Sequence, residues 1–491
     1  MRKINSFDVF DTLIARRCVL PELIFEEVES ISGFENFMVY RKQAEARIVS
    51  RGYTLDDIYR EFANMTGVSS EMIGLLRSLE IQQELENAIP IQDNLDKVNN
   101  GDVLITDMYL PRNVIEAMLR KIGLTKQVGL IVSAHGKSSG DIWPRVSSIV
   151  SISSHYGDSF YSDVKSPVAF DVYGKILKQS PLNDIERFYA DNGLELLSRL
   201  MRECRLKVLS AKCSRGRNMR YLLQVNYNMP ILMLASVHLY LMAAEEGRFN
   251  FLFSGRDCYA MEKLFRCLMG GAGLFFKSSY FLTSRISRVK ASDSYVRYVD
   301  AVFTKDSVVV DLCGTGLSLS QLFHKTKVVP CVYFFQYLKH WAVLDEKDGT
   351  NGIINLKYLT DSADIKNVFF ELLNYNLHGM LLDVSDIDGY DSMLPEFEDP
   401  EYPMAVKDAV GDILFAQEVF LDVLKNYKPI DLVKEASDFI SSACAAGFVG
   451  EVYEKMTGEM SCMQDVMDYH SIQNDKTVWR LSKVCGHYNT P

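Results

Sequence analysis

Apolar runs separated by polar turns predict a first α/β domain over residues 1–185. Strand-like segments lie at residues 4–9, 103–106, 129–133 and 153–157. Each is followed by turn or helix signals, which is the rhythm of a parallel sheet. We therefore expect a Rossmann-like α/β fold for this stretch.

Helical patterns interrupt this sheet between about residues 15 and 95. Thr54 precedes Asp57, and Ser69 precedes Glu71, so hydroxyls and acids fall where helix N-termini favour them. We interpret this helical insertion as a lid over the sheet.

The alternation returns in a second stretch, residues 186–345, after opening helices. Its strand candidates are 249–253, 280–283, 308–311 and 328–335. Residues 346–491 are mostly helical and acidic, with a turn-rich loop predicted at 383–403. We expect a second α/β domain that the C-terminal helices complete.

Composition indicates an ordinary globular protein of about three folded units, at roughly 150 residues per domain. The 491 residues are 48% hydrophobic and 24% charged. With 53 basic and 64 acidic side chains, the net charge of −11 does not favour nucleic acid as a partner.

The ten cysteines are scattered without a C-x-x-C pair, and we find no signal peptide. This predicts reduced thiols in a cytoplasmic protein, without a disulfide frame or a zinc site. The longest apolar run, 229–244, contains Pro230 and His238 and is shorter than the roughly 20 residues a bilayer span requires. We predict a buried helix there and no transmembrane segment.

Side chains with a carboxylate, a hydroxyl or an ammonium group follow four strands of the first domain. Asp8 follows the first strand, where α/β sheets place active sites and where a carboxylate can act as a nucleophile. A hydroxyl and an ammonium can bind phosphate oxygens, and carboxylates can hold Mg²⁺. The groups after the later strands are Thr106, Lys137, Asp158 and Asp163.

This ordered series resembles the haloacid dehalogenase superfamily, most of whose members are phosphatases. The resemblance covers about residues 1–180, and the insertion lies where that superfamily carries a cap. It implies that Asp8 is the nucleophile and that Mg²⁺ is the cofactor. The motifs are Asp8 with Thr12-Leu13, Thr106, Lys137-Ser-Ser-Gly140, and the pair Asp158 and Asp163; the implied metal ligands are Asp8, the Phe10 carbonyl, Asp158 and Asp163.

One position departs from that pattern. Phosphatases of this superfamily usually carry a second aspartate, the general acid/base, two residues after the nucleophile, where this chain has Phe10. Asp11 is the candidate replacement for this acid/base. Because consecutive side chains on a strand point to opposite faces, its side chain should point differently from that of residue 10. A degenerate scaffold without turnover is the alternative interpretation. A similar sub-branch, with an Asp-x-Phe-Asp-Thr-Leu opening, recurs in bacterial surface-polysaccharide contexts.

A second candidate site follows the strand at 308–311, where Gly314, Thr315, Gly316 and Ser318 come after Asp311. Such a turn exposes backbone N–H groups that bind anions. The glycines fall three and five residues after the acid, unlike the two, four and six of S-adenosylmethionine methyltransferases. The spacing resembles the Asp-x-x-x-Thr-Gly-x-Thr/Ser turn of type I phosphoribosyltransferases, whose first of two adjacent acids is Val310 here.

Two upstream strand ends supply arginines that fit this resemblance, Arg256 and Arg285, with Arg288 just beyond. Guanidinium groups stabilise a departing pyrophosphate. Each arginine alone favours a surface ion pair, but the set favours a phosphoribosyl pyrophosphate site. Its predicted residues are Gly255, Arg256, Asp257, Ser284, Arg285, Asp311, Gly314, Thr315, Gly316 and Ser318.

Two features of the sequence concern the acceptor substrate of such a transfer. Glu371 or His378 could deprotonate a hydroxyl, although a lone histidine is more often a satisfied core residue. Seven basic residues between Arg202 and Arg220 could dock an anionic acceptor or contact a membrane peripherally, or form a solvated helix face, which we favour.

Two phosphate-handling sites suggest sequential chemistry. We expect the second domain to transfer 5-phosphoribosyl from phosphoribosyl pyrophosphate to a glycan, lipid-linked acceptors included, and the first to remove the 5-phosphate, leaving ribofuranose. This pairing resembles bacterial systems for surface polysaccharides. The alternatives are a Mg²⁺-dependent sugar-phosphate phosphatase with a C-terminal binding or oligomerisation module, and a non-catalytic sugar-phosphate sensor.

Overall fold

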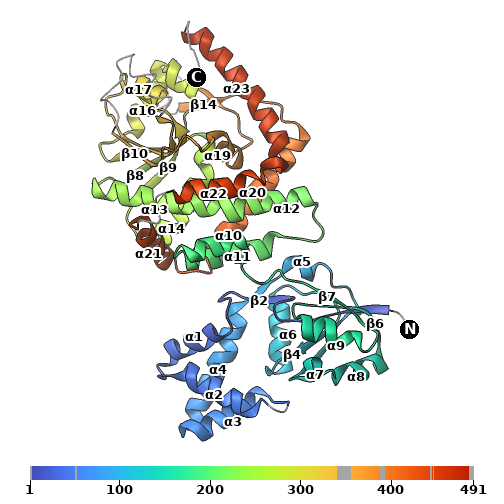
Figure 1. Ribbon diagram of the computed structural model, residues 1–491. Helices are drawn as coiled ribbons and strands as arrows, with labels where there is room; N and C mark the ends of the chain where they lie inside the picture. Colours follow the sequence, from blue (N-terminus) through green and yellow to red (C-terminus); the bar gives the residue numbers. More distant parts are fainter. Residues whose placement is uncertain are drawn as a thin grey trace. The chain divides into compact units, whose positions relative to one another are not determined.

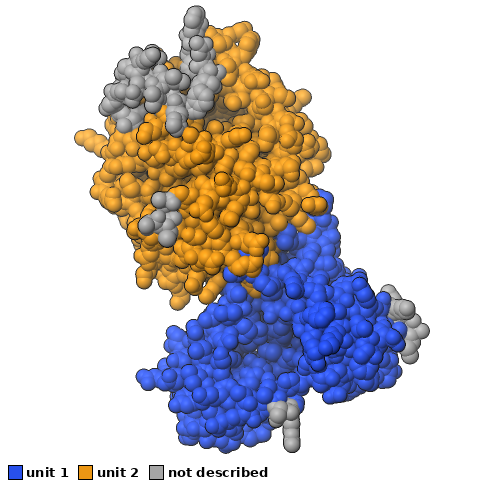
Figure 2. All heavy atoms as spheres, in the orientation of Figure 1, with its two compact units in different colours: residues 1–183, 206–214 blue, residues 184–205, 215–491 orange. Residues whose placement is uncertain are grey.

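The computed structural model describes residues 3–49, 52–339, 355–386, 393–442, 445 and 447–485. The chain forms two compact units (Figure 2): unit 1 is Met1–Asn183 with Leu206–Ser214, and unit 2 is Asp184–Arg205 with Arg215–Pro491. The fold class is α/β, and each unit contains a five-stranded parallel sheet. The segment after residue 345 belongs to the same unit as the second sheet.

The sheet of unit 1 has the strand order β5-β4-β1-β6-β7. The direction of strand addition reverses between β1 and β6, and open α/β sheets bind ligands beyond the carboxyl ends of strands at such a point. Four of these strands were predicted from sequence, and β7 was not. Their bounds are β1 Lys3–Phe7, β4 Val103–Asp107, β5 Gly129–Ser133, β6 Ser151–Gly157 and β7 Tyr173–Ile176.

Four helices, α1 to α4, lie between the short antiparallel strands β2 and β3, and form a group beside the sheet (Figure 1). Both predicted caps are present: Thr54 forms a capping box with Asp57, and Ser69 accepts from the Met72 amide. The bounds are β2 Ile14–Arg16, α1 Glu22–Ser32, α2 Phe37–Ile48, α3 Leu55–Thr66, α4 Ser70–Asn87 and β3 Ala88–Pro90.

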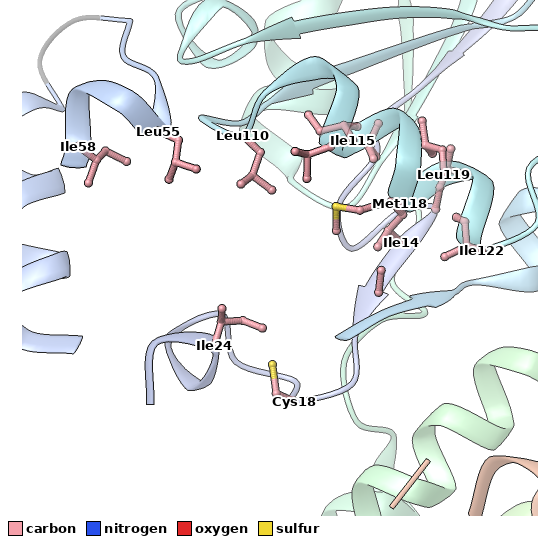
Figure 3. Close-up of a cluster of buried hydrophobic side chains, with 14 of the residues drawn as sticks. Ile14, Cys18, Ile24, Leu55, Ile58, Leu110, Ile115, Met118, Leu119 and Ile122 are labelled. Atoms are coloured by element: carbon pink, nitrogen blue, oxygen red, sulfur yellow. The ribbon is translucent and has the colours of Figure 1, made fainter. Parts of the chain in front are cut away.

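One apolar cluster joins the inserted helices to the sheet layer. Helix α6 (Arg112–Lys121) presents a buried stripe at helical spacing, because Ile115, Met118 and Leu119 share one face. Figure 3 shows these side chains together with Ile24 from α1 and Leu55 from α3. The insertion therefore shares a core with the sheet of unit 1.

A buried ion pair fixes the inserted helices further. Arg41 of α2 donates two hydrogen bonds of 2.8 Å to Glu80 of α4, and neither side chain is exposed. Tyr59 of α3 donates to the same carboxylate at 2.8 Å. The Arg41 guanidinium also lies 4.8 and 4.9 Å from the rings of Phe25 and Tyr109, the latter in the loop after β4. These contacts tie all four inserted helices to a loop of the sheet.

The sheet of unit 2 has the strand order β12-β11-β10-β8-β9. When its strands are numbered 1 to 5 along the chain and read from the β9 edge, this order is 2-1-3-4-5. This order places a switch point between β8 and β10. The strand β12 was not predicted. The bounds are β8 Asn250–Ser254, β9 Lys277–Phe281, β10 Ser307–Gly314, β11 Cys331–Tyr337 and β12 Leu356–Thr360.

The predicted loop at 383–403 is wrong in part, because β13 (Leu381–Asp386) and β14 (Met393–Phe397) form an antiparallel pair there.

Helices account for most of the remainder of both units. In unit 1 these are α5 Gln92–Leu95, α7 Gly136–Ser139, α8 Ile142–Ile149, η1 Phe160–Lys165 and α9 Ser166–Val168. In unit 2 and at its boundary they are α10 Asp184–Asp191, α11 Glu195–Val208, α12 Arg215–Leu222, η2 Leu223–Asn228, α13 Met229–Glu245, η3 Arg256–Cys258, α14 Tyr259–Gly271, α15 Arg285–Lys290, α16 Asp293–Val302, α17 Leu317–Phe323, α19 Asn367–Leu373, α20 Met404–Leu424, α21 Pro429–Ile440, α22 Phe448–Thr457, η6 Met460–Met463 and α23 Gln464–Cys485.

The helical stretch Arg215–Glu245 is long and apolar enough to cross a membrane by length and composition alone, but 67% of its apolar window is buried inside the structure. A core helix passes the same test. The eight cysteines whose side chains the structure describes form no disulfide with one another.

The basic stretch between Arg202 and Arg220 is not simply a solvated face. Arg202 and Arg205 are buried, and Arg205 donates two hydrogen bonds, of 2.6 and 2.9 Å, to Glu186. Arg220 pairs with Asp412 at 2.6 Å. The expectation of solvent exposure is therefore wrong for Arg202 and Arg205, and for Arg205 the carboxylate of Glu186 compensates the buried charge.

Candidate active sites

Unit 1 gathers charged groups at the carboxyl end of its central strands. Asp8 follows β1, and one of its oxygens accepts from the Lys137 ammonium, with which it is in direct contact. The same ammonium lies 2.8 Å from Asp163 Oδ1, and all three side chains are buried. Lys137 therefore bridges two carboxylates that come from distant parts of the chain.

Asp163 is held by a second set of contacts that the sequence did not suggest. His155 Nε2 lies 3.1 Å from Asp163 Oδ1, and the Ser159 amide donates to Oδ2 at 2.8 Å. Because the carboxylate only accepts, Nε2 carries the proton, and Nδ1 accepts from Ser6 Oγ at 2.8 Å. Burial lowers the pKa of His155, which favours this neutral form.

Asp107 positions Lys137. Its two oxygens accept from the backbone amides of Lys137 and Ser138, each at 2.9 Å, and from the hydroxyl of Ser133 at 2.7 Å. These bonds fix the short turn α7 after β5. The sequence analysis named only Thr106 at this strand end, whereas in the structure Asp107 orients the turn that carries the lysine.

Two threonines accompany the nucleophile candidate. Thr12 Oγ1 donates to Asp8 Oδ2 at 3.2 Å. Thr106 is buried on β4, and since Phe7 pairs with Leu104 in parallel register, Thr106 lies at the level just beyond the end of β1. The Thr12 hydroxyl therefore reaches Asp8 from the turn after β1, and Thr106 lies near the carboxyl end of the neighbouring strand.

The acidic groups fit a divalent cation. Oxygens of Asp8, Asp158 and Asp163 all lie within 4.8 Å of one another. Burial raises the pKa of Asp8 to about 7 against the opposing charge of Lys137, and burial with the charges of Asp11 and Asp163 raises the pKa of Asp158 to about 6. A bound cation would relieve this repulsion, and carboxylates are the donors that Mg²⁺ prefers.

Asp163 and Lys137 stay charged in this setting. Burial acts against ionisation of Asp163, but the hydrogen bond from His155 and the charge of Lys137 lower its pKa to about 2. Burial also disfavours the ammonium, yet Asp8 and Asp163 raise the pKa of Lys137 above its ordinary value. The pair is thus an ion pair across the neutral range.

At Phe10, where an acid/base was expected from the resemblance, the structure places an aromatic ring against a cation. The Arg16 guanidinium lies 4.8 Å from the Phe10 ring and donates two hydrogen bonds of 2.9 Å to Glu84 of α4. Asp11 adopts a left-handed backbone, φ 55°, and its carboxylate accepts from Ser180 Oγ at 2.6 Å. Asp11 is therefore held by Ser180, and it remains the nearest acidic residue in sequence to the nucleophile candidate, Asp8.

Unit 2 contains a cavity of about 940 Å³, counted to its open mouth, at the ends of β8, β9 and β10. Of the ten residues predicted to bind phosphoribosyl pyrophosphate it brings six together, and it also takes in both acceptor candidates, Glu371 and His378. The six are Gly255, Arg256, Asp257, Ser284, Arg285 and Asp311.

The other four predicted residues, Gly314, Thr315, Gly316 and Ser318, do not line this cavity. Strand β10 continues to Gly314, so the turn begins three residues later than predicted. The Thr315 hydroxyl accepts from the Leu317 amide at 3.3 Å inside its own turn. The predicted phosphate cradle is therefore separate from the cavity that the arginines line.

Three arginines line the cavity, and their guanidinium groups differ in their contacts. Arg288 pairs with Asp311 at 2.9 Å, and Arg256 lies 4.7 Å from the Tyr375 ring. Arg285 is exposed and makes no hydrogen bond or ion pair with any described residue. Its guanidinium is therefore available to an anion.

Helix α23 supplies cavity residues that sequence analysis missed. His470, Asn474 and Thr477 all line the cavity. Their spacing of four and three residues puts them on one helical face, but this pattern does not show that the face lines a cavity. His470 Nε2 lies 3.4 Å from Glu371 Oε2, and although burial opposes it, this contact lowers the pKa of Glu371.

Three buried polar atoms at the cavity lack a hydrogen-bond partner among the described residues: Ser254 Oγ, Asp257 Oδ1 and His470 Nδ1. Burial, with the charges of Glu371 and Asp311, raises the pKa of Asp257 to about 6, against the effect of the nearby Arg256. Unsatisfied buried polar atoms are uncommon in folded proteins, and here they gather where a polar ligand would satisfy them.

No known protein family matches this chain, and no curated protein is significantly similar to it. The chemistry of these two sites is therefore what indicates a function.

Proposed function

We propose that unit 1 is a Mg²⁺-dependent phosphatase whose nucleophile is Asp8. The observation that carries this proposal is the contact of Asp8 with Lys137, in a group that also contains Asp158 and Asp163, at the switch point of a parallel sheet. A carboxylate nucleophile next to an ammonium and further acids matches the needs of phosphoryl transfer.

In this proposal an oxygen of Asp8 attacks phosphorus, and the bond from phosphorus to the ester oxygen breaks. Lys137 stabilises the negative charge of the phosphoryl oxygens, and Asp11 donates a proton to the leaving alkoxide. Water then hydrolyses the aspartyl phosphate and regenerates Asp8. Mg²⁺, when bound by the acidic group, would add positive charge beside the transferring phosphoryl group.

Phosphate release from methyl ribofuranoside 5-phosphate tests this activity. Asp8→Asn is expected to lower kcat at least 10³-fold, since the amide is a poor nucleophile. Asp56→Asn, at an exposed aspartate paired with Arg77, is the matched control and should stay within twofold. Release by Asp8→Asn above a tenth of the wild-type rate contradicts the assignment, as does full activity in EDTA.

For unit 2 we propose transfer of 5-phosphoribosyl from phosphoribosyl pyrophosphate to a glycan hydroxyl, with unit 1 then removing the 5-phosphate. The supporting observation is the cavity, whose Arg256 and Arg285 suit a pyrophosphate. Free cysteines are compatible with a cytoplasmic setting, where phosphoribosyl pyrophosphate would be the donor.

Release of pyrophosphate in the presence of glycan acceptors tests the transferase. Arg285→Met should raise the KM for the donor at least tenfold, because it removes an unpaired cation from the cavity. Arg266→Met, at an exposed arginine on α14, is the control and should change nothing measurable. A phosphatase with a C-terminal binding module predicts donor binding without pyrophosphate release from any acceptor.

A further inference from the structure

A second pocket adjoins the cavity of unit 2, and we call it the tyrosine pocket. Its empty space, open solvent included, is about 400 Å³, and its lining includes Tyr375, Tyr402 and Tyr469, with Glu398 and Gln473. Arg256, His470 and Asn474 line both the tyrosine pocket and the cavity. The tyrosine pocket and the cavity are therefore neighbours that share part of their walls.

Hydrogen bonds hold two of these tyrosine rings in place. The rings of Tyr402 and Tyr469 lie 5.3 Å apart. Tyr402 donates to the carbonyl of His378 and Tyr469 to that of Glu401, each at 3.3 Å. Because each hydroxyl keeps acceptor capacity, these rings offer rigid apolar faces with polar edges.

The polar groups of the tyrosine pocket suit a neutral ligand. Glu398 pairs with Arg480 at 2.9 Å, so its charge is balanced while its oxygens can accept further hydrogen bonds. Gln473 and Asn474 add amides that donate and accept. The unpaired cation, Arg285, lines the cavity and not this pocket. A ring bearing hydroxyl groups matches aromatic faces flanked by such donors and acceptors better than a second anion does.

His470 lines both the cavity and the tyrosine pocket. Glu371 holds its Nε2 at 3.4 Å, and Asn367 in turn donates to Glu371 at 2.8 Å. Because the carboxylate only accepts, this contact favours the neutral tautomer with its proton on Nε2 and its lone pair on Nδ1. That Nδ1 atom is buried and has no partner among the described residues. By contrast, both nitrogens of His378 are engaged, with Tyr280 at 2.8 Å and the Gly379 carbonyl at 3.1 Å.

We propose that the tyrosine pocket binds the acceptor sugar and that His470 Nδ1, oriented by Glu371, is the base that removes the proton from its attacking hydroxyl. This assignment rests on the proposed transferase function. The hydroxyl oxygen forms a bond to the anomeric carbon of the donor, the bond from that carbon to pyrophosphate breaks, and pyrophosphate leaves with the electron pair. The hydroxyl proton passes to His470 Nδ1.

Sugar binding is tested without turnover, by saturation-transfer NMR on the full chain with methyl glucoside, methyl galactoside and methyl mannoside. The wild type should transfer saturation to at least one glycoside, and Tyr402→Leu with Tyr469→Leu should remove most of the signal. Tyr173→Leu, at an exposed tyrosine of unit 1, is the control and should retain it. Absence of signal in the wild type, or an equal signal in the double variant, overturns the pocket assignment.

The base is tested by kinetics with saturating phosphoribosyl pyrophosphate. His470→Gln should lower the transfer kcat by about 10²-fold or more, while the KM for the donor changes less than threefold. Imidazole should restore part of the rate to His470→Ala, which a merely structural role would not allow. A His470→Gln rate within threefold of wild type overturns the base assignment while leaving the transferase intact. Absence of pentose transfer by the wild type overturns the transferase itself.

Discussion

Lys137 Nζ lies 2.8 Å from Asp163 Oδ1, in a part of unit 1 where both side chains are almost fully buried. The lysine comes from the turn after β5 and the aspartate from η1 after β6, so this ion pair joins two strand ends across the sheet. Asp163 therefore holds the ammonium against Asp8, and the proposed nucleophile depends on a residue that need not touch the substrate.

Asp163→Asn is expected to lower phosphatase kcat by about 10²-fold or more. The amide cannot balance the charge of Lys137, and a broken buried pair costs about 3–5 kcal/mol, so activity should be normalised to the folded fraction measured by circular dichroism. Asp171→Asn, at an exposed aspartate of unit 1, is the control. A normalised kcat within threefold of wild type would show that Asp163 does not orient the lysine.

Gly157→Ala should damage the same site through backbone packing. A Cβ at this position would lie 2.2 Å from Asp163 Cγ, so the aspartate must move. Phosphatase activity should fall at least tenfold. Gly74→Ala on α4 is the contrasting variant, because its Cβ meets nothing within 4 Å and alanine favours a helix by about 0.5–1 kcal/mol. Urea denaturation should show Gly74→Ala to be as stable as wild type or more so.

The Arg41–Glu80 pair should matter for stability more than for chemistry. Glu80→Ala leaves a buried guanidinium without its bidentate partner, which should lower the free energy of unfolding by about 3–5 kcal/mol. Arg41→Met with Glu80→Leu should recover most of that loss, because it removes both charges. Urea denaturation followed by circular dichroism measures both. A double variant less stable than Glu80→Ala would contradict this ranking.

Anion binding to the cavity of unit 2 should strengthen as the pH falls through 6. Asp257 has a pKa raised to about 6 by burial, so it is ionised at pH 7.5 and mostly protonated at pH 5.5, where it no longer offsets Arg256. Sulfate is a suitable probe since its own charge is constant over this range. Calorimetry should give a lower Kd at pH 5.5.

In Asp257→Asn the carboxylate is absent, so the pH dependence of sulfate binding should flatten. A variant that keeps the full wild-type dependence would assign the effect to the histidines of the cavity instead. Wild-type affinity that weakens as the pH falls would contradict the assignment to Asp257.

Sequence patterns located the strand ends that carry chemistry, because a buried parallel strand is a continuous apolar run and the polar residue after it is conspicuous. Asp8, Lys137, Asp158 and Asp163 were found in this way, and the structure brings them together. Short strands with mixed composition were missed, as at β7, where Gly174 and Lys175 weaken the pattern.

Cavity residues that come from distant parts of the chain could not be predicted from local sequence patterns. His470 lines the cavity although it lies more than a hundred residues beyond Asp311, and only the packing of α23 against unit 2 brings it there. The turn after β10 shows the converse, because Thr315 and Gly316 match a binding motif in sequence but do not line the cavity. A motif specifies local backbone, whereas tertiary packing decides what that backbone faces.

The most direct test of sequential chemistry is the mass of the glycan product made from phosphoribosyl pyrophosphate in the presence of Mg²⁺. The wild-type chain should add one dephosphorylated pentose to the acceptor, and Asp8→Asn should add the same pentose with its phosphate retained. Addition of the phosphate-free pentose by both proteins, or of no pentose by either, would contradict the two-step account.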